Sequence, residues 1–120
     1  MVMGKVKVTV IKKFSSIDVF GKEYKNPKGE VIPECNIFKE GQVLFSEDGD
    51  KPEGFCGFGW RAIQAEAMVL AFGGNFWESW TEPGTMYVCC PDGVRPVVFK
   101  LERIEDWLIY LEGEFISFLV

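Results

Sequence analysis

The most informative stretch of the chain is residues 85–102, which read TMYVCCPDGVRPVVFKLE. A run of β-forming residues is followed by the turn signal Pro91-Asp92-Gly93 and then by a second apolar run at residues 95–102. Alternate positions of the second run would share one face of a strand, and they hold Val97, Phe99 and Leu101. The stretch therefore predicts a β-hairpin with one apolar face.

Upstream of the hairpin, the pattern predicts two further strands. Apolar and polar residues alternate through residues 6–10, as in a half-buried strand, and residues 43–46 are typical of a short strand. Residues 14–30 are polar and are expected to form a loop with at most one helical turn. Residues 31–38 are expected to be extended.

Residues 60–72 carry the clearest helical pattern, which a glycine-rich lead-in precedes and Gly73-Gly74 ends. One face of this helix would hold Trp60, Ile63, Ala67, Leu70 and Ala71. Because the adjoining face is also apolar, we expect a nearly all-apolar helix that is covered on most sides. The expected fold class is α+β, a mostly antiparallel sheet packed on this one main helix.

The composition excludes several classes of function. The 120 residues carry a net charge of −5, so the chain lacks the basic surface that a nucleic-acid partner requires. Histidine is absent, which excludes Ser-His-Asp and Cys-His catalytic groups and histidine-bound metals. No apolar stretch reaches the roughly 20 residues of a membrane span, and the N-terminus lacks the apolar block of a signal peptide. We therefore expect a cytoplasmic protein that binds neither nucleic acid nor a membrane.

Several sequence blocks occur in a fixed order. They are CNIFKEG at residues 35–41, KPEGFC at 51–56 with Trp60 four residues on, FGG at 72–74 and CCPDGVRPVVFK at 89–100. In these blocks the chain resembles a family of small, uncharacterised prokaryotic conserved hypothetical proteins, over residues 5–104. The resemblance implies that the blocks belong to one recurring domain, and it implies no activity.

The groups best suited to chemistry are the four cysteines, Cys35, Cys56, Cys89 and Cys90. Because neighbouring residues of a strand point to opposite faces, at most one of Cys89 and Cys90 joins a common site, and we expect it to be Cys90. One interpretation is a metal site in which Cys35, Cys56 and Cys90 hold zinc or iron and leave a fourth position open. The other is that these thiols are small buried hydrophobic groups.

Cys56 is the strongest single candidate for a catalytic residue, because it lies at the start of the expected helix. Backbone amides at that position stabilise a thiolate. Glu53, three residues earlier, is a candidate general base. Both fit a pocket at the helix start that binds a small ligand, with enzymatic activity left open. The same segment is also consistent with a helix start that merely packs Phe55 and Phe58.

Other residues are expected to line that pocket as ligand-binding groups. Arg95 is suited to an anionic group, and Asp92 lies in the same turn. Trp60, Trp77 and Trp80 are expected to form aromatic walls, although the two tryptophans of the loop at residues 75–84 also suit an interface. The sequence requires no cofactor, and zinc or iron belongs to the alternative metal site alone.

Residues 106–120 follow the expected single domain of residues 1–105 and are unusually apolar. Their large apolar side chains are those of Trp107, Leu108, Ile109, Tyr110, Leu111, Phe115, Ile116, Phe118, Leu119 and Val120. Such a segment must pack on its own domain or on a neighbouring subunit. Exchange of the segment between subunits predicts a homo-oligomer. A third interpretation of the function is therefore a non-catalytic oligomeric interaction module.

Overall fold

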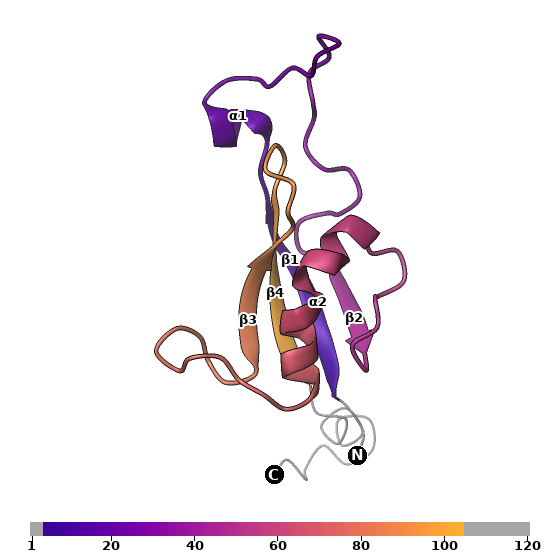
Figure 1. The fold of residues 1–120 in the computed structure, drawn as a ribbon, viewed down its shortest axis with the longest axis vertical. Helices are drawn as coiled ribbons and strands as arrows, with labels where there is room; N and C mark the ends of the chain where they lie inside the picture. The colour runs from indigo at the N-terminus through magenta and orange to yellow at the C-terminus, as the bar shows by residue number, and fades with distance from the viewer. Residues whose placement is uncertain (1–3, 105–120) are drawn as a thin grey trace.

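The computed structural model describes residues 4–104, which form a four-stranded antiparallel sheet with one long helix on one face (Figure 1). The strands are β1 (Lys5–Lys13), β2 (Val43–Glu47), β3 (Thr85–Cys89) and β4 (Val97–Ile104), in the spatial order β2-β1-β4-β3. The helices are α1 (Ser16–Phe20) and α2 (Gly57–Ala71). The α+β class expected from the sequence is confirmed. None of the helices within this part of the chain combines the length and apolar character that a membrane span needs.

The two central strands carry the strongest alternation in the sequence. Val8 of β1 lies opposite Leu101 of β4 and Leu44 of β2. The buried side chains of the two strands alternate along one face, and they are Val6, Val8 and Val10 of β1 and Val97, Phe99 and Leu101 of β4. The predicted hairpin forms, but β4 starts at Val97 rather than at residue 95. Asp92 holds the intervening turn by accepting hydrogen bonds from two backbone amides, and this widens the connection.

Helix α2 begins at Gly57, three residues before the predicted start. Its buried face agrees with the helical pattern and consists of Gly59, Trp60, Ile63, Ala67, Leu70 and Ala71. The expected cover on most sides is not confirmed, because Phe58 and Val69 are 58% and 39% exposed and Arg61 and Gln64 face solvent. The helix therefore has an ordinary solvent face that includes apolar side chains.

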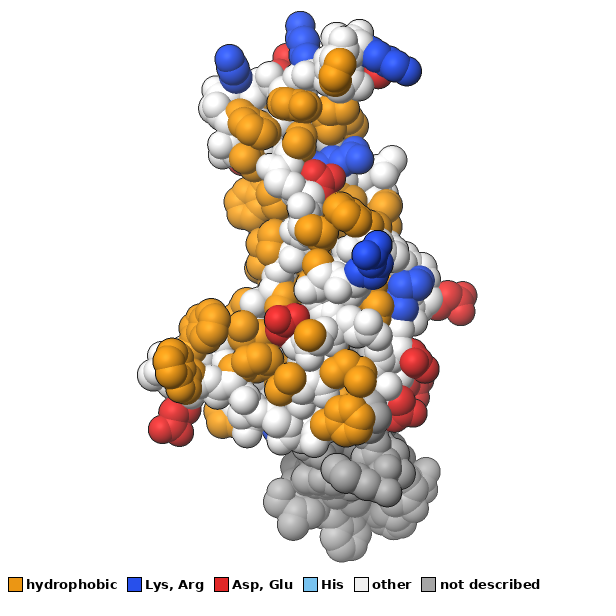
Figure 2. Space-filling model, in the orientation of Figure 1, with side chains coloured by type: hydrophobic (Ala, Val, Ile, Leu, Met, Phe, Trp, Pro, Cys, Tyr) orange, Lys and Arg blue, Asp and Glu red, His pale blue; other side chains and the backbone are white. Residues whose placement is uncertain are grey.

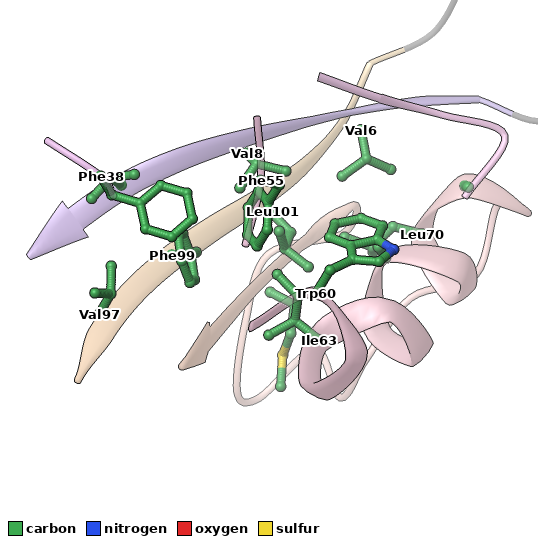
Figure 3. Packing of buried hydrophobic residues seen from close by; sticks show 14 residues of the cluster. Val6, Val8, Phe38, Phe55, Trp60, Ile63, Leu70, Val97, Phe99 and Leu101 are labelled. Atoms are coloured by element: carbon green, nitrogen blue, oxygen red, sulfur yellow. The ribbon is translucent and has the colours of Figure 1, made fainter. Parts of the chain in front are cut away.

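Three phenylalanines join the sheet to the loops beside it (Figure 3). The ring of Phe99 on β4 lies 5.1 Å from the rings of both Phe38 and Phe55, and the last two are 4.8 Å apart. All three are buried. Since Phe38 precedes β2 and Phe55 precedes α2, this cluster fixes both connecting segments against the sheet.

Residues 14–42 form a long excursion between β1 and β2. It opens with α1, whose capping box pairs Ser15 with Asp18, and α1 lies beyond the end of β1, away from α2 (Figure 1). Residues 31–38 were expected to be extended, but they form no strand. The only bridge within them joins Val31 to Lys25. The apolar segment at residues 106–120 lies outside the described residues.

Candidate functional site

A pocket of about 120 Å³ lies where three segments meet. The segments are the loop at residues 35–38, the first turn of α2 and the β3–β4 connection. Its lining consists of Cys35, Asn36, Ile37, Phe38, Cys56, Phe58, Gly59, Cys90, Asp92, Arg95 and Val97. Three of the sequence blocks described above, at residues 35–41, 51–56 and 89–100, thus supply this one pocket.

Lys13, the last residue of β1, fixes the first of these segments. Its ammonium group donates a hydrogen bond of 2.9 Å to the carbonyl oxygen of Cys35 and lies 3.5 Å from the Glu34 carboxylate. Its backbone amide donates to Glu40 Oε2 at 2.9 Å. The loop therefore takes its position from a strand residue rather than from strand pairing of its own.

The second segment presents Cys56 as the N-cap residue of α2. Its carbonyl oxygen accepts the first helical hydrogen bond, from Trp60 at 2.8 Å, and its thiol makes no capping hydrogen bond. Gly59 faces both cysteines at ordinary van der Waals distance, since a Cβ atom there would lie 3.7 Å from Cβ of Cys90 and 3.9 Å from Cβ of Cys56. Two thiols from distant parts of the sequence therefore flank one helical turn.

The third segment separates the adjacent cysteines. Cys90 lines the pocket, and its sulfur accepts a hydrogen bond of 3.3 Å from the Val97 amide. Cys89 is exposed and does not contribute to the lining. Although Cys89 is exposed, desolvation of its thiol, together with the neighbouring Cys90, raises the pKa of this thiol above its usual value. The alternation expected along the strand therefore holds at this pair.

An ion pair stands within the same connection. Arg95 Nε donates a hydrogen bond of 3.0 Å to Asp92 Oδ2, while Asp92 Oδ1 accepts from the amides of Val94 and Arg95. Burial raises the pKa of Asp92, but the hydrogen bonds from Arg95 and from these amides outweigh it and hold this pKa below its usual value. Asp92 is therefore ionised at neutral pH and orients the guanidinium from its Nε side.

The structure brings together five of the residues selected from the sequence, namely Cys35, Cys56, Cys90, Asp92 and Arg95. It corrects four others. Trp60 is 4% exposed and packs on Phe55 in the core, so it forms no pocket wall. Trp77 and Trp80 are 78% and 66% exposed on the loop between α2 and β3 and do not line the pocket. Figure 2 shows hydrophobic side chains on this loop, which projects to the left. Glu53 is exposed and contributes nothing to the lining.

The apolar lining was missed in the sequence. Ile37, Phe38, Phe58 and Val97 supply it, together with the polar side chain of Asn36. The block CNIFKEG was noted for its cysteine and its resemblance, but nothing local in it shows that it meets the hairpin. Phe58 lies in the first turn of α2, ahead of residue 60, where the helical pattern of the sequence begins.

The three pocket cysteines do not form a metal centre in this structure. Across residues 4–104, no group of three Cys, Asp or Glu side chains is close enough to hold one ion. No family model, curated protein or solved structure matches the chain. The interpretation of the site therefore depends on its own geometry.

Proposed function

We propose that this pocket binds a small, largely apolar organic molecule that carries one anionic group. The observation that carries the proposal is the position of Arg95, which lines an otherwise mostly apolar cavity and is held there through Nε alone. In the described part of the chain, no other hydrogen bond to its guanidinium is found. The two terminal amino groups are therefore free to donate to a carboxylate.

The size of the cavity supports a ligand about as large as one ring. Its volume of about 120 Å³ is close to the ~150 Å³ of an engineered apolar cavity that takes benzene. Ile37, Phe38, Phe58 and Val97 would contact the apolar part of such a molecule. The pocket fits the general pattern of ligand sites, in which a few polar groups orient a ligand among apolar walls.

An enzymatic form of this function rests on Cys56. Its thiol lines the pocket, sits at the N-terminus of a fifteen-residue helix and makes no capping hydrogen bond. We infer that any covalent chemistry in the pocket starts at Cys56, with Arg95 holding the anionic end of the substrate.

Benzoate and benzamide test the binding function, because they share a ring and differ in charge. Calorimetry or ligand-detected NMR should show benzoate binding to the full chain more tightly than benzamide does. Arg95→Gln should remove this preference. Arg61→Gln, on the solvent face of α2 and outside this lining, makes the same change in charge and should leave the preference intact. Equal binding of the two probes, or equal effects of the two substitutions, would contradict the proposal.

A further inference from the structure

The face of the sheet opposite α2 is uncovered within residues 4–104. Strand alternation and the antiparallel register direct residues from all four strands to this side, and these residues define the open sheet face. They are Lys5, Lys7 and Thr9 of β1, Lys100 and Glu102 of β4, Val43, Phe45 and Glu47 of β2, and Thr85 and Tyr87 of β3. Helix α2 lies on the other side, and α1 lies beyond the end of β1 (Figure 1).

The open sheet face is more apolar than a solvated face requires. Val43, Phe45 and Tyr87 are 44%, 45% and 49% exposed, and they lie on the two outer strands. Their surface would stabilise whatever segment buries it by about 25 cal/mol for each Å² removed from water. The face therefore offers an apolar surface on each side of its central strands.

The same face has a small excess of positive charge, because Lys5, Lys7 and Lys100 share it with only two carboxylates, Glu47 and Glu102. Lys5 lies 5.6 Å above the ring of Phe45, and Lys100 pairs with Glu102 at 3.4 Å. Among the described residues, neither Lys5 nor Lys7 has a carboxylate partner. A segment that fits this face would combine large apolar side chains with carboxylates and would lack basic residues.

Residues 105–120 have this composition. They contain the ten large apolar residues named above, four carboxylates and no lysine or arginine. The carboxylates are those of Glu105, Asp106, Glu112 and Glu114.

The segment also starts at the face. It follows Ile104, the last residue of β4, which is a central strand and pairs with Lys5 of β1. A four-stranded sheet measures about 14 Å between its outer strands. Sixteen residues span about 24 Å even as a helix, so the segment is long enough to cross the sheet.

We propose that residues 105–120 dock on the open sheet face of their own chain and place the sheet between two layers. Direct connection to β4 gives the segment an effective concentration on the order of millimolar or more at its own sheet. This favours the same chain over a neighbouring subunit. The proposal is independent of the ligand pocket, which lies on the other side of the sheet at the start of α2.

Carbodiimide cross-linking of the full chain tests this arrangement, because it joins carboxylates to lysines in direct contact. Glu112 and Glu114, which are far enough from Ile104 to be informative, should link to Lys5, Lys7 or Lys100. An equal mixture of ¹⁴N- and ¹⁵N-labelled protein should yield these links within one isotope only. Links mainly to lysines outside the face would overturn the proposal, and so would links that mix the isotopes, because they would show a second copy.

A pair of substitutions separates docking from chance contact. Phe45→Asp places a carboxylate on the open sheet face and should reduce the cross-links from Glu112 and Glu114 several-fold. Phe72→Asp makes the same change at a residue that follows α2 and is 52% exposed, and it should leave them unchanged. Circular dichroism on both variants confirms that they are folded. Equal cross-linking in the two folded variants would contradict the docking.

Discussion

Asp92 orients Arg95 and at the same time accepts two backbone amides of the β3–β4 connection. The carboxylate thereby organises a turn and positions the group that we assign to ligand binding. Because its side chain is 29% exposed, solvent screens the ion pair, and its contribution to the free energy of unfolding is about 1 kcal/mol or less.

The lowered pKa of Asp92 predicts a pH dependence of stability with a definite sign. The stabilisation is complete above the unfolded pKa of ~3.9 and declines as the pH falls through the lower folded value. The difference in unfolding free energy between the natural chain and Asp92→Asn should therefore be constant near neutral pH and shrink below about pH 4. Asp18, whose pKa is lowered by hydrogen bonds from Ser15, titrates in both proteins and cancels. Urea denaturation across this range measures the difference, and one that grows toward acid pH would contradict the account.

At the scale of single elements, helix α2 has a replaceable glycine at its contact with the hairpin. Gly59 has an ordinary helical backbone, and a Cβ atom there would make normal contacts with Phe55, Cys56 and Cys90. Gly59→Ala should therefore raise the free energy of unfolding by up to about 1 kcal/mol. The same methyl group would occupy part of the pocket lining and weaken benzoate binding.

Thermal denaturation and benzoate titration of Gly59→Ala check both parts of this prediction. Gly57→Ala is the matched control, because a Cβ atom at Gly57 meets nothing within 4 Å and Gly57 is not part of the lining. A destabilised Gly59→Ala would show that the contact is tighter than the structure has it. Unchanged benzoate binding would show that this turn of α2 does not contact the bound ligand.

The other end of α2 depends on Arg103 of β4. Its Nη1 donates to the carbonyl oxygens of Leu70 and Gly74 at 3.2 and 2.6 Å, and its Nη2 donates to Asn75 Oδ1 at 3.1 Å. A cation at a helix C-terminus also interacts favourably with the helix dipole. Arg103→Gln should therefore lower the free energy of unfolding by about 1.5–3 kcal/mol. Urea denaturation measures the loss, with Arg61→Gln as the control for charge. Equal stability of the two variants would rule out this role.

Local patterns predicted the elements better than their ends. The hairpin and α2 were predicted because period-two and helical spacings are strong in residues 97–101 and 60–71. The first turn of α2 was missed because its two glycines are weak helix formers. Residues 31–38 form no strand because hydrogen bonds from Lys13, distant in sequence, determine the course of this loop.

Only part of the pocket lining could be predicted, because some of its residues meet the others only in the tertiary fold. Cys56, Cys90 and Arg95 were selected because their chemistry is visible in the sequence, but Asn36 and Ile37 join them only through the tertiary fold. The prediction that Trp60 forms a pocket wall could have been avoided. Its helical spacing already placed it with Ile63 on the face that packs against the sheet, and a residue on that face does not line a pocket at the helix start.

At the scale of the whole molecule, Phe99 joins the sheet to the segments that precede β2 and α2. It is fully buried and contacts the rings of Phe38 and Phe55, which precede β2 and α2. Phe99→Ala should therefore lower the free energy of unfolding by about 3–5 kcal/mol. Trp77→Ala removes a larger ring that is 78% exposed and should change it by about 0.5 kcal/mol or less. Chemical denaturation of both variants checks the contrast. Equal losses in the free energy of unfolding would contradict the central position of Phe99 in the core.

Assembly is the other property of the whole molecule. The apolar composition of the C-terminal segment predicts a homo-oligomer. Docking of that segment on its own sheet, as proposed above, predicts that the full chain scatters light as a monomer of 13.6 kDa. A dimer at micromolar concentration would contradict docking within one chain and would favour exchange of the segment between subunits.

The central claim is that Arg95 draws a small anion into a pocket lined by cysteines. Alkylation by iodoacetate and by its neutral counterpart iodoacetamide tests this most directly, since mass spectrometry reports the rate at each cysteine. We expect the iodoacetate-to-iodoacetamide rate ratio to be higher at Cys56 and Cys90 than at Cys89, which lies outside the pocket. Arg95→Gln should abolish this excess and Arg61→Gln should preserve it. The same ratio at all three cysteines, or an excess that survives Arg95→Gln, would contradict the account.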